Sequence, residues 1–261
     1  MQHHSATLDA YVESVRSSPT CLAVILGGSV ARGTERPDSD VDVHLVVTED
    51  AFSAARSAGG LSFTTGDPAT YEGGYVDVKV VSPSVLRAAG ERGDEPTRAA
   101  FLGARTVWSR LDSLDATLAS IPHLPDDEWD RRRDSAVAQM RLYSAYFVPQ
   151  GAALGDRYLL TWAALHQATS AGRALLAHHH VLFQGPKYLR SAVAALSGVT
   201  AETVRSFDRL VQEPGVGVST ELLIAVESLV RAPLPPDQTL GRYVADTELA
   251  WLWRTPTPEA Y

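Results

Sequence analysis

Two aspartates stand where an apolar run begins: the sequence reads DVDVHLVV over residues 40–47. Aspartate is disfavoured inside β-strands, and residues two apart in a strand point to the same face. If this run is a strand, Asp40 and Asp42 hold two like charges close together. A divalent cation is the partner that would best offset their repulsion, so the pattern predicts a metal site.

A third aspartate stands in a second alternating run, YVDVKVV over residues 75–81. If the two runs are neighbouring strands, Asp77 joins Asp40 and Asp42 on one face. Three carboxylates form an oxygen-only ligand set suited to Mg²⁺ or Mn²⁺. Such sets hold two ions about 3.5–4 Å apart and serve phosphoryl or nucleotidyl transfer. The alternative is that the aspartates are solvated on an open face or paired with arginines.

A glycine-rich turn precedes the aspartates. Gly27-Gly28-Ser29 follows the apolar run CLAVIL at 21–26 and comes before an expected helical turn. Glycine lets the backbone approach a ligand closely, and free N–H groups with a serine hydroxyl suit an anion. Alone this is a turn signal; a dozen residues before Asp40 and Asp42, it predicts a phosphate-binding segment.

Together these segments resemble the signature of the nucleotidyltransferase superfamily that includes DNA polymerase β, and most of all its minimal and antibiotic-modifying branches. The resemblance rests on Gly28-Ser29, Ala31-Arg32-Gly33 and Asp38-Ser39-Asp40-Val41-Asp42, with Asp77 as the third acid. It covers 26–47 and 75–81. It implies a catalytic domain built on a mixed β-sheet with flanking helices.

The resemblance also implies roles. Gly28 and Ser29 would hold the β- and γ-phosphates of a nucleoside triphosphate, with ATP expected. Asp40 and Asp42 would bind two Mg²⁺ ions, for which Mn²⁺ can substitute. Asp77 would bind the catalytic ion and help to deprotonate the acceptor hydroxyl.

Two further residues are expected at the nucleotide. Ser39 lies inside the motif. Lys187, in GPKYL at the start of an expected helix, is one of only two lysines in the chain. Helical domains behind this catalytic fold often supply a lysine to the triphosphate, so we expect Lys187 to contact phosphate; the alternative is a surface lysine. Lys79 is expected beside Asp77, where it can pair with the carboxylate.

The whole chain of 261 residues indicates an α+β protein with two domains. We expect a nucleotidyltransferase domain over 1–110 and an all-α acceptor-binding domain over 111–261, with the boundary inside 111–126. Expected strands are 21–26, 41–47, 61–65, 75–81 and 106–108. Expected helices are 8–15, 51–58, 82–90, 127–147, 156–180, 188–197, 201–212, 219–231 and 239–253.

The net charge bears on the class of partner that the chain binds. The formal net charge is −8. Nucleic-acid-binding proteins usually carry a basic face, so a nucleic-acid substrate is disfavoured. The N-terminus lacks the pattern of a signal peptide, and no apolar stretch approaches the roughly 20 residues that span a bilayer. We therefore expect a cytoplasmic protein, monomeric or homodimeric, without a membrane partner.

The second half carries weaker signals. Arg131-Arg132-Arg133 is expected on a solvated face, and Tyr243, Trp251 and Trp253 mostly in packing. The segment HHHVLFQGP at 178–186 resembles a histidine tag with a viral-protease site, but it lies between two helical patterns, and we interpret it as a native loop. Acids that would bind a cationic acceptor or act as general base are Glu128, Asp130, Asp134 and Asp156.

Three functions remain open at this point. The leading one is transfer of a nucleoside monophosphate, with AMP expected, to a hydroxyl of a small molecule such as an aminoglycoside- or lincosamide-like antibiotic. The second keeps the chemistry but modifies a protein or tRNA, as in toxin–antitoxin pairs. The third is an inert nucleotide-binding module, which the three intact aspartates disfavour.

Overall fold

A computed structural model describes residues 1–231 and 234–253 of the chain. The chain divides into two compact units, Met1–His123 and a second that begins at Leu124. Each unit is built around its own apolar core.

The first unit contains a five-stranded mixed sheet in the order β3-β4-β2-β1-β5. β2 and β4 run parallel, and the other neighbouring strands are antiparallel. A parallel pair needs a crossover connection, and residues 48–75 supply it with a helix and the edge strand β3. The strands are β1 (Cys21–Leu26), β2 (Val41–Val47), β3 (Ser62–Thr65), β4 (Val76–Val81) and β5 (Arg105–Ser109).

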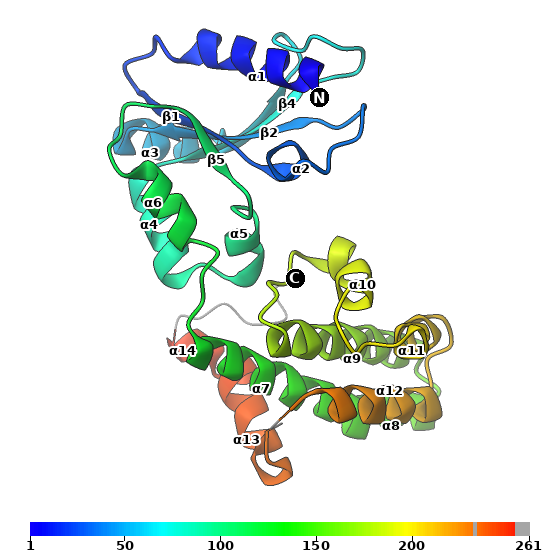
Figure 1. The fold of residues 1–261 in the computed structure, drawn as a ribbon. Helices are drawn as coiled ribbons and strands as arrows, with labels where there is room; N and C mark the ends of the chain where they lie inside the picture. Colours follow the sequence, from blue (N-terminus) through cyan, green and yellow to red (C-terminus); the bar gives the residue numbers. More distant parts are fainter. Residues whose placement is uncertain (232–233, 254–261) are drawn as a thin grey trace. The chain divides into compact units, whose positions relative to one another are not determined.

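Helices cover both faces of this sheet (Figure 1). On one face α1 packs Leu8, Tyr11 and Val12 against apolar side chains of β1, β2 and β4. On the other face α4 and α6 pack against β1 and the ends of β2 and β4. The helices of this unit are α1 (Gln2–Val15), α2 (Gly28–Arg32), α3 (Glu49–Ser57), α4 (Pro83–Arg92), α5 (Glu95–Ala99) and α6 (Leu114–Ser120).

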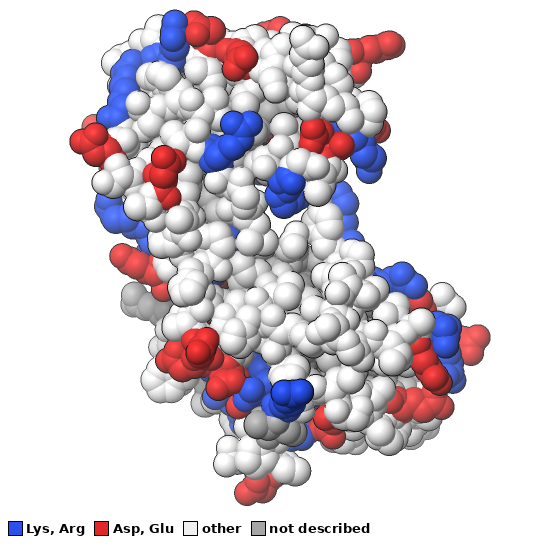
Figure 2. All heavy atoms as spheres, viewed as in Figure 1, with Lys and Arg blue, Asp and Glu red and all other residues white. Residues whose placement is uncertain are grey.

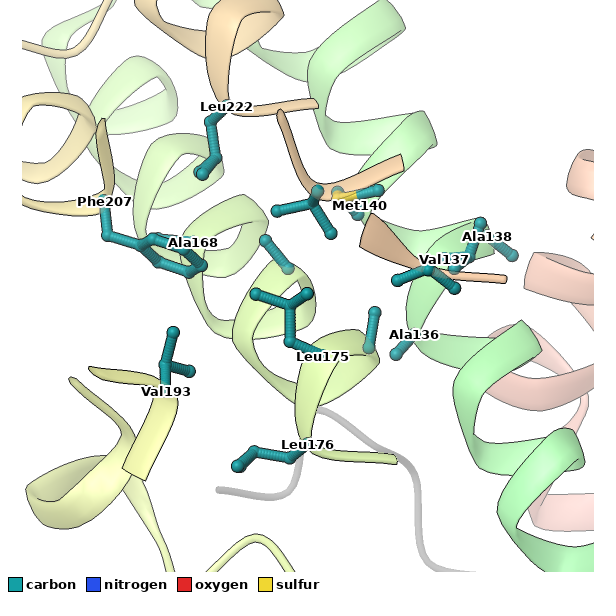
Figure 3. Close-up of a cluster of buried hydrophobic side chains, with 14 of the residues drawn as sticks. Ala136, Val137, Ala138, Met140, Ala168, Leu175, Leu176, Val193, Phe207 and Leu222 are labelled. Carbon is teal, nitrogen blue, oxygen red and sulfur yellow. The ribbon is translucent and has the colours of Figure 1, made fainter. Parts of the chain in front are cut away.

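The second unit is helical. Side chains from α7, α9, α10, α11 and α12 converge in its core (Figure 3). A π-helical turn, Tyr143–Phe147, continues α7 into α8. The helices are α7 (Asp126–Leu142), α8 (Val148–Leu154), α9 (Arg157–His178), α10 (Pro186–Ala194), α11 (Ala201–Gln212), α12 (Val216–Leu229), α13 (Thr239–Tyr243) and α14 (Ala250–Trp253).

The α+β class is confirmed, and the structure corrects several details. The short helices α5, α6 and α8 were not predicted, because one or two helical turns leave little periodicity to detect. Trp251 and Trp253 are exposed rather than packed. The arginine run is only partly solvated: Arg131 is exposed, whereas the side chains of Arg132 and Arg133 are mostly buried and paired with nearby acids.

Charge is spread rather than gathered. On the face that Figure 2 shows, Lys and Arg side chains alternate in small groups with Asp and Glu in each unit.

Within residues 1–231 and 234–253, no helix combines the length and the apolar character needed to cross a bilayer.

Part of the tag-like segment is buried in the second unit. α9 ends at His178, and His180 stacks on Trp129 with ring centroids 5.4 Å apart. Leu182 and Phe183 are buried, and the Arg173 guanidinium lies over the Phe183 ring. Leu182 and Phe183 thus anchor the connection between α9 and α10, whereas His180 is exposed.

Because Leu182 and Phe183 are buried, we predict that a viral 3C protease, which cleaves between Gln and Gly of such sequences, leaves the folded chain uncut at Gln184. The time course of cleavage followed by mass spectrometry checks this. Leu175→Ala is the matched variant, since it leaves the protease site unchanged but removes a fully buried side chain from the same core, at a cost of about 2–5 kcal/mol. Its cleavage should be faster; rapid cleavage of the unchanged chain would contradict a packed segment.

Candidate active site

The parallel pairing of β2 with β4 brings two of the predicted carboxylates together. The register sets Asp42 opposite Asp77, so the predicted adjacency of these strands is confirmed. Asp40 lies one residue before β2, where the Val41 amide donates to the Tyr75 carbonyl at 3.1 Å. Each of the three aspartates offers one carboxylate oxygen, and these oxygens all lie within 4.8 Å of one another.

Asp42 carries the electrostatic cost of this arrangement. Its pKa is raised, first by burial and then by the negative charges of Asp40 and Asp77. Arg32 and Lys79 oppose the shift. The group therefore holds more negative charge than its surroundings compensate, as expected of a cation-binding set.

Lys79 supplies part of the compensation. Its ammonium group donates to both carboxylate oxygens of Asp77, at 2.8 and 3.1 Å, and to the Ser62 hydroxyl at 2.8 Å. Lys79 is half exposed, so the pair is screened by water. This matches the prediction that Lys79 pairs with Asp77.

Gly28 lies directly against Asp42. Its φ is +62°, and a Cβ built at this position would lie 1.6 Å from Asp42 Oδ2. The preceding residue ties the turn to the strand, since the Gly27 amide donates to the Asp42 carbonyl at 2.9 Å. Gly28 and Ser29 then begin the short helix α2. The turn thus needs glycine at position 28, both for its backbone conformation and to leave room for the carboxylate.

His44 lies in β2 two residues after Asp42 and is largely buried. Its burial was not predicted. Alternation placed it on the same face as the aspartates, but it stacks on Phe101 with ring centroids 4.6 Å apart and is 9% exposed. Burial lowers its pKa to about 4, with Lys79 adding to the effect. A neutral ring therefore separates the carboxylates from the apolar core that contains Phe101.

Ser39 and Lys187 lie in different settings. The Ser39 carbonyl accepts hydrogen bonds from the Tyr71 hydroxyl and the His4 ring, and its hydroxyl accepts from the Arg36 amide. Lys187 lies in the first turn of α10 in the second unit, with its ammonium 5.4 Å from the centroid of Tyr188. Contact of either residue with a nucleotide stays a prediction.

The acids proposed for the second unit have structural partners. Asp130 and Asp134 both pair with Arg133, and Glu128 pairs with Arg131 and Arg132. Asp156 caps α9 by accepting from the Leu159 amide. These contacts favour structural roles for this set of acids.

The carboxylate group fits a hard divalent cation. Its donors are oxygens only, they converge from the two strands β2 and β4 and the end of one loop, and the partly buried Asp42 has a raised pKa. Mg²⁺ and Mn²⁺ prefer this donor chemistry. Asp40, Asp42 and Asp77 are the residues that would hold it.

Residues 9–137 match the family model described as "Nucleotidyltransferase domain". The match contains the sheet, the Gly28 turn and all three aspartates. The chain therefore carries a nucleotidyltransferase domain and is an enzyme of that class.

Two solved structures resemble the chain at low identity. One is a nucleotidyltransferase-like protein from Exiguobacterium sibiricum 255-15, 14% identical, covering 92% of this chain and 78% of that chain at a TM-score of 0.49. The other is a spectinomycin adenyltransferase from Enterococcus faecialis, solved with ATP and spectinomycin, 13% identical, covering 92% and 96% at a TM-score of 0.35. Neither likeness bears on the substrate of this chain. No curated protein matches it.

We predict that Gly28→Ala destabilises the first unit by about 2–4 kcal/mol, because left-handed strain adds about 1 kcal/mol and overpacking against Asp42 about 1–3. The free energy of unfolding in urea checks this. Gly33→Ala is the matched control: its φ is +68°, and an added Cβ meets nothing within 4 Å. It should show the strain alone, and equal losses for the two variants would contradict the overlap with Asp42.

We further predict that stability falls between pH 6.5 and pH 4 because His44 is held neutral. Its pKa is about 4 in the folded chain against 6.5 unfolded. The unfolded chain therefore binds the proton first as the pH falls, and about 3 kcal/mol is lost across this window. The raised pKa of Asp42 acts in the opposite sense, since it lowers stability as the pH rises. Urea unfolding with a chelator present should show a flatter profile for His44→Gln than for the unchanged chain; identical profiles would refute the assignment to His44.

Proposed function

We propose that this chain transfers a nucleoside monophosphate, AMP in the first place, from a nucleoside triphosphate to a hydroxyl group of a small molecule, in a Mg²⁺-dependent reaction that releases pyrophosphate. The observation that carries the proposal is the convergence of Asp40, Asp42 and Asp77 inside a nucleotidyltransferase domain. A structural ion-pair network would instead place arginines among these carboxylates. Among the described residues the printed ion pair of these carboxylates is that of Asp77 with the half-exposed Lys79, and the positive charges of Arg32 and Lys79 oppose the raised pKa of Asp42 without cancelling it.

The aspartates would hold the cations and receive the proton. Bound divalent ions would neutralise and align the triphosphate. Asp40 and Asp42 serve as ligands. Asp77, which would also be a ligand, would accept the proton of the acceptor hydroxyl while the oxygen of that hydroxyl attacks the α-phosphorus. The bond from the α-phosphorus to the β-phosphate oxygen then breaks, and that electron pair leaves on pyrophosphate.

The turn beside Asp42 would receive the triphosphate tail. The space that a Cβ of Gly28 would take is occupied by Asp42 Oδ2. The backbone of Gly28 and Ser29 beside this carboxylate would approach the phosphate, as glycine permits. Ser39 would lie near the same nucleotide. The lysine on α10, Lys187, would contact phosphate from the second unit. Positioning and charge neutralisation supply most of the rate in such reactions.

The acceptor is proposed to bind through the helical part of the chain. We assign residues 1–110 to catalysis and 111–261 to the acceptor. The net charge of −8 favours a cationic compound, because a negative surface raises the local concentration of a cation. An aminoglycoside- or lincosamide-like antibiotic with free hydroxyl groups fits this chemistry.

We predict pyrophosphate release that requires Mg²⁺, an acceptor and Asp42. The assay supplies each of the four nucleoside triphosphates with a panel of aminoglycosides, lincosamides and nucleoside-like hydroxyl compounds. Asp42→Asn should lower the rate at least about 10²–10³-fold, since it removes charge placed for the transition state. The metal-free variant should be at least as stable as the unchanged chain, because burial and two neighbouring charges already disfavour the Asp42 carboxylate.

Asp38→Asn is the matched control. Asp38 is an exposed aspartate four residues before Asp42 that pairs with Arg36 and lies outside the carboxylate group, so its replacement should keep the rate within about 2-fold. Silence across the panel, with triphosphate binding intact by calorimetry, would shift the acceptor to a protein or tRNA. If the chain bound no nucleoside triphosphate at all, the proposed transfer reaction would be refuted.

A further inference from the structure

Asp40 differs from the other two carboxylates in how the fold holds it. Asp42 and Asp77 lie inside β2 and β4, where the ladder fixes their backbone. Asp40 lies outside the strand, at the end of the connection from α2 to β2. A residue at the end of a loop needs other contacts to fix its direction.

Two side chains from distant parts of the chain meet at the peptide group just before Asp40. The Tyr71 hydroxyl donates to the Ser39 carbonyl at 2.5 Å, and the His4 ring nitrogen Nε2 donates to the same oxygen at 3.1 Å. A carbonyl oxygen has two lone pairs, so these donors satisfy it fully. Fixing this carbonyl fixes the plane of the 39–40 peptide and thus the positions of the nitrogen and Cα of Asp40, from which its side chain leaves the backbone.

Packing alone does not explain why residue 4 is a histidine, because a buried ring nitrogen without a hydrogen bond lowers stability. It is fully buried in α1, and its other ring nitrogen, Nδ1, has no hydrogen-bond partner among the residues that the structure describes. A buried unpaired polar atom costs about 1–3 kcal/mol, which an apolar side chain would avoid. The hydrogen bond that Nε2 donates to the Ser39 carbonyl is what histidine provides here and an apolar side chain would not.

Tyr71 is held in place by its own neighbours. Its ring lies 4.6 Å from that of His3 and 5.2 Å from that of His4, measured between centroids. The segment before it is tied to α1, since the Thr70 amide donates to the Thr7 hydroxyl at 3.0 Å. Burial raises the pKa of Tyr71, and the negative charge of Asp40 adds to the shift.

We propose that His4 and Tyr71 are positioning residues that set the affinity of the carboxylate group for its divalent cation by orienting Asp40 through the Ser39 carbonyl. The inference rests on the proposed function and extends it to residues outside the motif. Neither residue belongs to the carboxylate group. They act on the one member of the group that the sheet does not fix.

The test is the binding of Mn²⁺ alone to the full chain, measured by the loss of the free-ion signal in electron paramagnetic resonance. Tyr71→Phe keeps the ring and removes the donor, and we expect its Mn²⁺ dissociation constant to rise about 3- to 10-fold. Adding His4→Phe removes the second donor and should weaken binding further. In the transfer assay Tyr71→Phe should raise the Mg²⁺ concentration for half-maximal rate more than it lowers the rate at saturating Mg²⁺.

Thr7→Val is the matched control. It removes two hydrogen bonds between the same helix and the same segment without changing the contacts of Ser39, so it should lower the thermal midpoint while Mn²⁺ affinity stays within about 2-fold. Equal loss of affinity in Thr7→Val and Tyr71→Phe, or none in Tyr71→Phe, would overturn the positioning role alone. Mn²⁺ binding by the unchanged chain that does not depend on Asp42 would overturn the proposed function together with this inference.

Discussion

The structure depends on the parallel pairing of β2 with β4, which forces two carboxylates into opposite positions of one ladder. Like charges directly opposite one another destabilise a sheet. The pairing holds because the alternate residues of both strands, Val41, Val43, Val76 and Val78, are almost fully buried against α1 and β1. Apolar burial on one face therefore stabilises an arrangement that the other face opposes.

That opposition accounts for the unusual residues around the aspartates. Lys79 lies where it can offset Asp77, and Gly28 stands where any side chain would occupy the space of the Asp42 carboxylate. His44 fills the position below them and stays neutral, so it adds no charge that would cancel the negative field. Gly28 and His44 leave the negative charge of the group concentrated, which is the property that a divalent cation requires, whereas Lys79 offsets part of it.

Much of this could be predicted from the sequence because the signals are local. The alternation in β2 and β4 predicts the strands and the face that the aspartates share, and the family motif predicts their adjacency. The burial of His44 could not be predicted, since alternation assigns a side chain to a face without showing what covers that face, and Phe101 comes from a distant segment. Arg132 and Arg133 were misassigned for a different reason: their charged residue types suggested solvent, although their acidic partners stand within the same helix.

The contacts of Ser39 show the limit most clearly. His4 and Tyr71 are separated from Ser39 by 35 and 32 residues, and neither stands in an alternating or helical pattern that marks it as functional. Their convergence depends on how α1 crosses the sheet and on where the connection between β3 and β4 returns.

The fold also divides the carboxylate group into a rigid and an adjustable part. Any change that moved Asp42 or Asp77 would disturb the β2–β4 ladder and with it the core beneath α1. Asp40 can shift with the loop that carries it while the ladder stays intact. A chain built in this way can change its affinity for a cation through substitutions in α1 and in the β3–β4 connection. Such substitutions leave the ligands unchanged and the sheet paired.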